Sequence, residues 1–369
     1  KDSASERYIF TLLNKITRLI YPSVDDNILN YLSDDGQSVE PIYYVPIIPM
    51  VLINGAKGIG TGFSTDIMSY NPLQIINRLE LMLKNNNNYK LITIDPYYEG
   101  FQGTIEKIDE GKKYLITGSY EIINDNKVKI NELPIGTWTQ DYKEFLETLI
   151  DSKKKDSIVK DFNDNSTDTI VNFMIEFKLG TLKELLDKKI EHGMNGLHKF
   201  LKLYSIQSTT NMHLFNNKEQ LKKYNSPEEI VDDYYDTRLE YYKIRKEFLL
   251  NKLNSDLKLI SNKTRFISET INDIIDLRKK KKIEIVQILS KHKFDDIYNN
   301  DYEYLRKMPM DSVCEESIEK MKKEKDEINM NINELEGSSN EELWLKELLV
   351  FKDEYIKLYN NNNPKEIST

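Results

Sequence analysis

The chain has 369 residues, enough for two or three domains, and its 61 Asp and Glu outweigh its 52 Lys and Arg, for a net charge of −9. One cysteine excludes an internal disulfide framework, and four scattered histidines argue against a zinc site. No apolar run reaches the roughly 20 residues that would span a bilayer. The acidic total argues against a nucleic-acid binder, although local clustering of basic residues decides more than the sum.

The chain begins with Lys1, followed closely by Arg7 and Tyr8, and then by apolar residues at helical spacing as far as Ile20. This spacing predicts a helix that ends before Pro22. A tyrosine phenol, with a pKa of about 10, is a poor nucleophile, but an adjacent guanidinium can favour the phenolate and hold a phosphate. Arg7-Tyr8 is therefore a candidate for attack on a phosphodiester. On these two residues alone, a surface Arg beside a packed aromatic is the commoner case.

A second unusual segment begins with residues 40–54, which are apolar and β-branched and contain three prolines, a pattern typical of an extended or edge strand. Four glycines follow between 55 and 62. They fit neither a Walker A loop, which needs Lys-Ser/Thr after the last glycine, nor a dinucleotide fingerprint, which needs a glycine at Phe63. Ile59, flanked by glycines, either belongs to a packed turn or stands out as an apolar wedge between base steps.

The middle of the chain predicts an α+β domain with a mixed or antiparallel sheet. Before this domain, Asp25 and Asp26 predict the start of a short helix through Leu32, and Asp34-Asp35-Gly36 predicts a turn. Helices are expected at 72–83 and 142–149, and strands near 103–108, 114–118, 127–130, 169–177 and 200–204. Trp138 is expected to be a core residue.

The last third of the chain predicts long helices. Ser226-Pro227 predicts a helix start with Pro at the first helical position, and after Pro227 no Pro or Gly occurs until past Lys282, which predicts a helix of about 50 residues. Heptad seams run from Leu253 to Ile274 and from Cys314 to Leu335, and Gly337-Ser338-Ser339 is expected to end the second helix. Two seams separated by an insert indicate an antiparallel coiled coil with a globular tip, and the basic run at 278–282 indicates a solvated turn.

Two of these segments resemble motifs of eukaryotic-type DNA topoisomerase II, a type IIA enzyme. Residues 1–11, KDSASERYIFT, resemble its active-site tyrosine segment. Residues 46–64, PIIPMVLINGAKGIGTGFS, resemble the segment that carries its DNA-intercalating isoleucine. Weaker resemblances at 301–310 and 342–348 extend the likeness over the whole chain.

The resemblance implies roles for five residues. Tyr8 would be the nucleophile, left joined to a 5′ end of DNA, and Arg7 would bind the scissile phosphate. Lys1 would lie near the DNA backbone, and Ile59 would be the intercalating wedge. Lys57 replaces a usual Glu and would add positive charge near DNA. No metal ligand is expected on this chain.

The resemblance also implies an α+β multidomain fold in three parts. Residues 1–24 would be the C-terminal end of a winged-helix domain, and residues 25–225 a mixed α/β tower domain. Residues 226–369 would form a long antiparallel coiled coil with the helical exit gate, or C-gate, whose tip lies at about 279–312.

The implied function is that of the C-terminal part of a breakage-reunion core in an ATP-hydrolysing topoisomerase. Such an enzyme makes a transient double-strand break and passes a second duplex through it. ATP and Mg²⁺ would be bound by ATPase and TOPRIM parts absent from this chain, so the chain alone is expected to be inactive.

The expected partners are double-stranded DNA and a second copy of the chain, which would meet the first through the C-gate; no membrane is expected. The expected location is the nucleus, or a cytoplasmic factory if the protein is viral. Two alternatives remain open: a separate breakage subunit of a split type II topoisomerase, and a non-enzymatic coiled-coil dimerisation protein.

Overall fold

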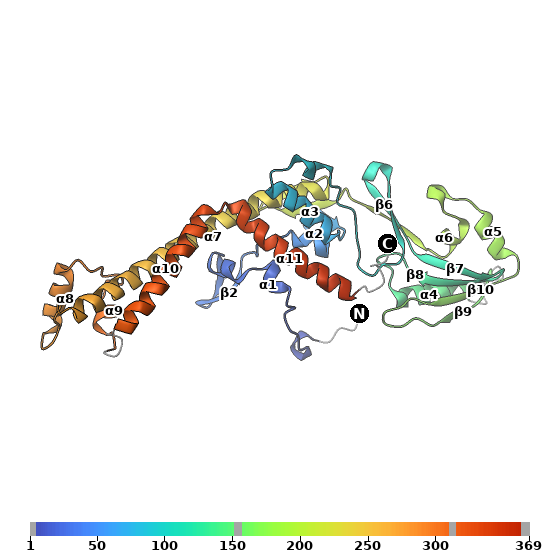
Figure 1. The fold of residues 1–369 in the computed structure, drawn as a ribbon. Helices are drawn as coiled ribbons and strands as arrows, with labels where there is room; N and C mark the ends of the chain where they lie inside the picture. The colour runs from blue at the N-terminus through green and yellow to red at the C-terminus, as the bar shows by residue number, and fades with distance from the viewer. Residues whose placement is uncertain (1–4, 151–156, 310–314, 363–369) are drawn as a thin grey trace. The chain divides into compact units, whose positions relative to one another are not determined.

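The computed structural model describes residues 5–150, 157–309 and 315–362 (Figure 1). Lys1, Cys314 and the last three residues of the expected tip lie outside this described part. The chain divides into two compact units, residues 1–47, 83–85 and 236–369, and residues 48–82 and 86–235. Helices and strands occur in both units, as the predicted α+β class requires.

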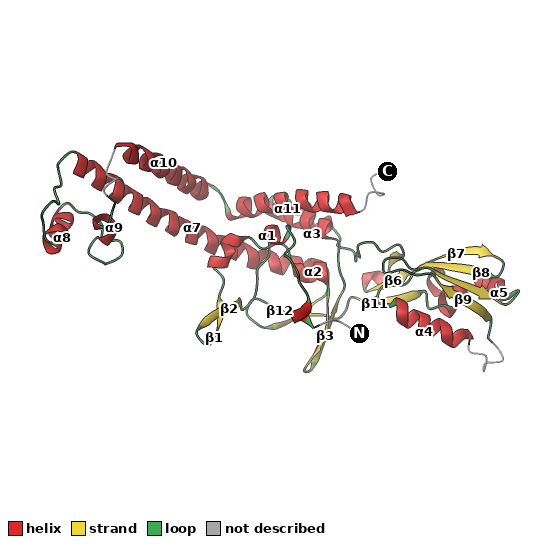
Figure 2. Ribbon diagram, turned by 90° about the horizontal axis from the view of Figure 1, so that it is seen from below, coloured by secondary structure: helices red, strands yellow, loops and turns green. Residues whose placement is uncertain are grey.

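The second unit contains antiparallel sheets (Figure 2). One has the strand order β7-β8-β10-β9, another has the order β11-β6-β5, and β3-β4 and β12-β13 are hairpins. The strands are β3 (Ala56–Gly60), β4 (Phe63–Ile67), β5 (Thr104–Ile108), β6 (Lys113–Thr117), β7 (Ser119–Asn124), β8 (Lys127–Glu132), β9 (Val159–Asp164), β10 (Phe173–Phe177), β11 (Tyr204–Ser208), β12 (Met212–Phe215) and β13 (Leu221–Tyr224).

Short helices accompany these sheets, and two of them confirm sequence predictions. The helix expected at 72–83 is α3, and the one expected at 142–149 is α4, slightly longer than predicted. The helices are α2 (Met50–Asn54), α3 (Pro72–Leu83), α4 (Thr139–Ile150), α5 (Thr181–Asp187) and α6 (Gly196–Phe200), with 3₁₀ turns η3 (Asn87–Leu91), η4 (Asp109–Gly111) and η5 (Glu191–Gly193).

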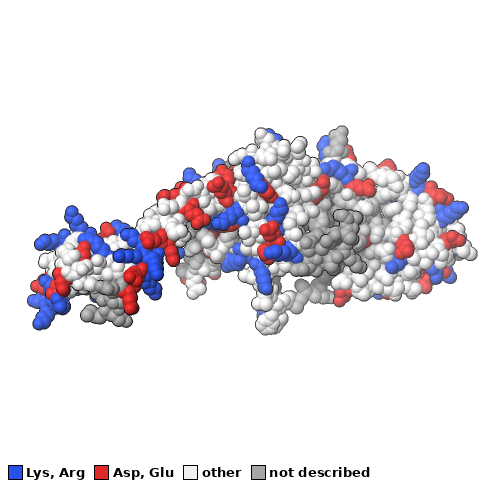
Figure 3. Space-filling view, viewed as in Figure 1, with Lys and Arg blue, Asp and Glu red and all other residues white. Residues whose placement is uncertain are grey.

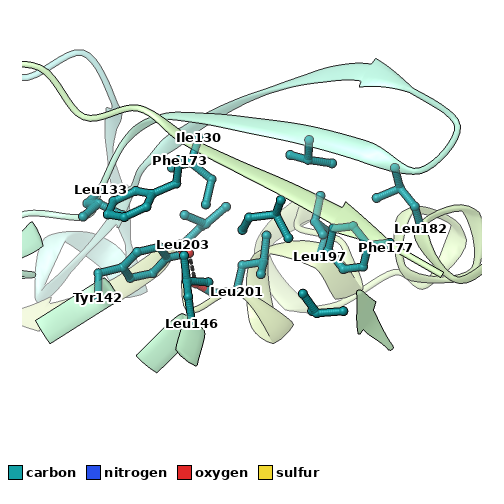
Figure 4. Packing of buried hydrophobic residues seen from close by; sticks show 13 residues of the cluster. Ile130, Leu133, Tyr142, Leu146, Phe173, Phe177, Leu182, Leu197, Leu201 and Leu203 are labelled. Carbon is teal, nitrogen blue, oxygen red and sulfur yellow. Dashed lines mark hydrogen bonds between the residues drawn. The ribbon is translucent and has the colours of Figure 1, made fainter. Parts of the chain in front are cut away.

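The core of the four-stranded sheet lies between its inner face and helices α4, α5 and α6 (Figure 4). Alternate residues of β10 point inward, so Phe173, Ile175 and Phe177 are all buried. A polar atom within this core is satisfied, because the buried Tyr142 hydroxyl donates to the Leu201 carbonyl at 2.7 Å. Each fully buried large apolar side chain contributes about 1.5–3 kcal/mol to folding.

His198 makes the stability of this unit sensitive to pH. Partial burial lowers the pKa of His198, whose ring packs edge-on against Tyr120 with centroids 5.2 Å apart. The unfolded chain therefore binds more protons, so the free energy of unfolding falls as pH drops through about 6.5. We expect urea unfolding between pH 7 and about pH 5.5 to show this loss of stability. In His198→Gln the free energy of unfolding should change less steeply with pH. His192→Gln, at an exposed position, is the control; equal slopes in all three proteins would contradict the prediction.

The first unit is dominated by long helices. The predicted long helix is α7 (Pro227–Ile271), 45 residues, whose first turns belong to the second unit. Helix α10 (Glu315–Gly337) runs back alongside the far half of α7, and the predicted stop at Gly337 is confirmed (Figures 1 and 2). The remaining elements are η1 (Glu6–Tyr8), α1 (Thr17–Ile20), η2 (Ser23–Asn27), β1 (Tyr31–Asp34), β2 (Gln37–Pro41), α8 (Lys282–Lys291), α9 (Glu303–Arg306) and α11 (Asn340–Asn362).

The end of α7 carries a small globular core. Phe266, Ile275, Leu289, Phe294 and Leu305 are buried together there. Lys and Arg side chains gather on the surface around α8 and α9 (Figure 3). The basic run at 278–282 is an exposed turn, as predicted, and its two ends form ion pairs with acidic side chains at 2.8 and 2.9 Å.

Several sequence predictions are wrong. The strand expected near 200–204 begins only at Tyr204, because Phe200 still belongs to helix α6. Residues 50–54 form helix α2 instead of a strand, because the three prolines interrupt ladder pairing and Pro49 directly precedes the first helical turn. The helix expected after Asp25 ends at Asn27, and Tyr31 begins a hairpin strand. Trp138 is 76% exposed and not a core residue, because it lies in the loop that leads into α4.

Candidate functional site

Tyr8 and Arg7 lie in the 3₁₀ turn η1, where the Tyr8 amide donates to the Ser5 carbonyl at 2.9 Å. The Tyr8 side chain is 74% exposed. The Arg7 guanidinium carbon lies 5.8 Å from the centre of the Tyr8 ring, and Arg7 Nε donates to Ser5 Oγ at 3.3 Å. Among the described residues no carboxylate pairs with Arg7. A phenol and a guanidinium thus stand side by side, both open to an anion from solvent.

The helix predicted to follow Tyr8 is largely absent. Within residues 9–20 only Thr17–Ile20 is helical, and residues 9–16 are irregular. Phe10, Leu12 and Leu13 are exposed. A short amphipathic segment gains its helical stability from packing its apolar face. In the described part of the chain Ile9, Leu12 and Leu13 are left exposed, whereas Ile16, Leu19 and Ile20 are half-buried, which agrees with a helix confined to Thr17–Ile20.

Ile59 stands on the hairpin β3-β4, where it pairs with Ser64 and is 94% exposed. The connection has two residues, and the second, Gly62, has a φ of +82°, which favours glycine. A Cβ on Gly60 would lie 2.7 Å from the Phe63 ring, so the absence of a side chain lets that ring fold across the strand. The hairpin therefore presents an isoleucine on a narrow backbone.

The hairpin is held at its base by β12 and the residue before it. The Asp66 amide donates to the Asn211 carbonyl at 2.8 Å, and Asn211 Nδ2 donates to Ser64 Oγ at 2.9 Å. Phe63 meets Phe215 edge to face with centroids 5.8 Å apart. Sequence reasoning missed these supports, because Asn211 and Phe215 lie about 150 residues from the glycine-rich segment and carry no recognisable motif.

Lys57 shares a strand face with Ile59, two residues away on β3. Its Nζ lies 3.6 Å from Asp66 Oδ2 across the hairpin, and its side chain is largely exposed. Exposed pairs of this kind are worth only about 0–1 kcal/mol, so the ammonium can leave its partner for another anion at little cost. A positive charge and an apolar side chain thus project from the same hairpin.

A buried ionic network anchors the segment that follows α1 to two helices of the first unit. Arg238 on α7 is fully buried, and its Nη2 donates to Asp25 Oδ2 at 2.8 Å while its Nη1 donates to the Val45 carbonyl at 2.7 Å. Arg245 lies 3.3 Å from Asp25 Oδ1 and donates to Glu347 on α11 at 2.9 Å. Sequence reasoning missed this network, because nothing in a helical pattern marks a buried arginine.

An aromatic pair completes the network. The Tyr242 ring lies within 4.3 Å of both guanidinium carbons and stacks on Trp344, and its hydroxyl donates to Glu347 Oε2 at 2.6 Å. Burial is the main cause that raises the pKa of Tyr242. The Trp344 indole N–H donates to the Ile47 carbonyl at 3.0 Å, so a buried hydrogen bond also joins α11 to the segment that follows α1.

The candidate residues fall into two groups. Arg7 and Tyr8 lie together in the first unit, and Lys57 and Ile59 lie together in the second. Across residues 5–150, 157–309 and 315–362, no three His, Cys, Asp or Glu side chains are grouped so that they could hold a metal ion. In the same part of the chain, no helix is long and apolar enough to cross a membrane.

Comparison with known proteins shows which family and which solved fold this chain resembles. Residues 1–349 match the family model for the A subunit of DNA gyrase and topoisomerase IV. A solved structure of the topoisomerase II DNA-binding, cleavage and re-ligation domain of Plasmodium falciparum superimposes with a TM-score of 0.86 at 33% identity, covering 100% of this chain and 52% of that one. The fold is thus that of a type II topoisomerase cleavage domain.

Curated relatives agree. The chain is 37% identical to DNA topoisomerase 2 of Pisum sativum and 34% identical to DNA topoisomerase 2-beta of Mus musculus, over 95% and 97% of its length. It spans 26% and 24% of the length of these two relatives. The chain belongs to the family defined by the DNA gyrase and topoisomerase IV A subunits.

Proposed function

We propose that this chain is part of a type II DNA topoisomerase that cuts both strands of a duplex through 5′-phosphotyrosine links and passes a second duplex through the break. The observation that carries the proposal is an exposed Tyr8 beside the open guanidinium of Arg7 in a chain of this family. In this proposal residues 1–24 end a winged-helix domain, residues 25–225 form the tower, and residues 226–369 form the coiled coil and C-gate.

The chemistry assigned to Tyr8 is an exchange of two phosphoester bonds. Its Oη attacks the phosphorus of a backbone phosphodiester and a new P–O bond forms, while the bond from phosphorus to the 3′ oxygen breaks. The phenol proton is given up, and the departing 3′ oxygen takes up a proton. The 5′ phosphate stays on Tyr8. Arg7 supplies charge-assisted hydrogen bonds to the phosphoryl oxygens as their negative charge develops.

The β3-β4 hairpin is assigned to bending the duplex. Ile59 would enter between two base pairs, unstack them and kink the helix axis. Lys57, and Lys1 at the start of the chain, would contact backbone phosphates, which position a duplex without reading its sequence. The support is the exposure of Ile59 and Lys57 on one strand face, with a base fixed by β12.

The wider assignments concern the complete protein. ATP and Mg²⁺ would be required there and held by ATPase and TOPRIM parts. Two copies would meet through the C-gate formed by the coiled coil of α7 and α10. The proposed location is the nucleus.

The wedge assignment gives a prediction about Ile59→Ala. Because the side chain is exposed, we expect the thermal unfolding midpoint to stay the same while the bend imposed on a bound duplex decreases. Fluorescence energy transfer between dyes on the two duplex ends would measure the bend. Ile122→Ala, at another exposed isoleucine of the same unit, should leave it unchanged. A full bend with Ile59→Ala would contradict the assignment.

The proposed function is tested by locating the covalent link. Cleavage by the complete protein with ATP and Mg²⁺ would be stopped with detergent, and the nucleotide-bearing peptide identified by mass spectrometry. We expect a phosphotyrosine at Tyr8 on the 5′ end. The present chain alone should not relax supercoiled DNA under the same conditions. A nucleotide on another residue would overturn the role proposed for Tyr8, and no adduct at all would favour a non-enzymatic dimerisation protein.

A further inference from the structure

A cavity of about 490 Å³ lies in the second unit, beside the start of α7. Four lysines from four separate segments line it: Lys90 in η3, Lys107 in β5, Lys112 in the turn before β6, and Lys223 in β13. Glu228 is the acidic side chain among its described lining residues, and its Oε1 accepts the Ile94 amide at 2.8 Å.

Counter-charges for these lysines are few: Asp95 pairs with Lys107, and Asp109 interacts electrostatically with Lys112. Lys107 Nζ lies 3.3 Å from Asp95 Oδ1. The other three lysines form no ion pair with any carboxylate in the described ranges. Like charges that converge on one cavity repel each other, and an anion in the cavity removes that repulsion. The chain as a whole is acidic, with 61 Asp and Glu, yet lysines outnumber acidic side chains in the lining of this cavity. This excess of positive charge indicates an anionic ligand.

Hydrogen-bond donors line the same cavity. Thr93 and Ser226 contribute hydroxyl groups. Ser226 Oγ accepts the Glu229 amide at 3.3 Å, so its own hydrogen remains available to a ligand. The cavity also includes Pro227, the first residue of the 45-residue helix α7, whose dipole favours negative charge at this end. Ammonium groups with neutral hydroxyl donors are a combination that suits phosphate oxygens.

We propose that this cavity binds a phosphate-bearing ligand. Its volume falls in the range of about 300–1,000 Å³ that holds small organic ligands, larger than a single phosphate requires. The phosphate can come from a free phosphorylated molecule or from the backbone of a nucleic acid. The site is separate from Arg7 and Tyr8, and it does not depend on the function proposed for them.

The first test uses inorganic pyrophosphate as the probe. Isothermal titration with the full chain, at constant ionic strength, should show saturable binding. The double variant Lys112→Gln/Lys223→Gln should bind about tenfold more weakly or worse, because two charge-assisted contacts are lost. The control Lys183→Gln/Lys199→Gln removes two exposed lysines of α5 and α6 in the same unit and should bind like the parent. Equal melting midpoints would show that both variants fold.

The second test asks whether the phosphate belongs to a nucleic acid. Binding of a short duplex is measured by anisotropy over a range of salt concentrations. If the cavity holds backbone phosphates, the Lys112→Gln/Lys223→Gln variant lowers the slope of log K against log salt by about 2. If it holds a free phosphorylated molecule, only pyrophosphate binding changes. The proposal is overturned if both lysine pairs behave alike in both titrations, whatever the Tyr8 adduct assay gives.

Discussion

Tyr8→Phe, made in the complete protein, is expected to reduce formation of the covalent DNA adduct by about 10⁴-fold or more, because removing a nucleophile removes the step that it performs. The fold should be unaffected, since the side chain is 74% exposed and phenylalanine keeps the ring beside Arg7. Adducts would be counted after detergent quenching, and noncovalent binding followed by anisotropy. We expect binding within about twofold of the parent, because the phosphate contacts remain.

A matched control uses another exposed tyrosine of the first unit. Tyr298→Phe removes a hydroxyl of the same kind and should leave adduct formation unchanged. Adducts that persist in Tyr8→Phe would remove this tyrosine from the chemistry. A variant that loses both adducts and binding would instead indicate that the phenol contributes to docking the duplex.

Arg238→Met is expected to destabilise the first unit by about 3–5 kcal/mol, because it leaves the buried Asp25 carboxylate with only Arg245 as its partner. The Val45 carbonyl would also lose its hydrogen bond. Urea unfolding of the chain, followed by tryptophan fluorescence, would measure the change, since Trp344 is buried in the same network. Replacing both partners, Asp25→Asn with Arg238→Met, should recover part of the loss.

An exposed arginine-aspartate pair in the same unit provides the comparison. Arg18 Nη1 lies 3.1 Å from Asp26 Oδ2, with both side chains about half exposed. Arg18→Met should change the free energy of unfolding by less than about 1 kcal/mol. If the two arginine variants lose similar amounts of stability, burial is not the reason that Arg238 matters.

Periodicity in the sequence identified the elements that depend on local pattern. Helix α7 was predicted because no Pro or Gly interrupts it, and helix α3 because its apolar residues repeat at helical spacing. The hairpin turn at Gly36 was likewise readable from Asp-Asp-Gly, since only a few residues adopt the left-handed conformation that a tight turn needs. Each of these features depends on residues that lie close to one another in the sequence.

Motifs in the sequence identified the candidate site residues without their geometry. The Arg7-Tyr8 pair and the isoleucine between two glycines were visible as strings, and the family resemblance gave them roles. Whether Tyr8 was buried or open, and whether Ile59 lay in a packed turn or at an exposed hairpin, could not be read from the strings. Exposure depends on which distant residues cover a side chain, and Phe215 and Asn211 are examples of such residues.

By itself the sequence determined the long helices, the tight turns and the residue types at the candidate site, because these follow from local backbone preference and from motif. The tertiary structure alone decided that residues 9–16 are not helical, that Trp138 is exposed and that Arg238 is buried. It also brought four lysines from separate segments to one cavity. The physical reason is that burial and charge convergence are set by contacts between residues far apart in the chain, which local propensity does not encode.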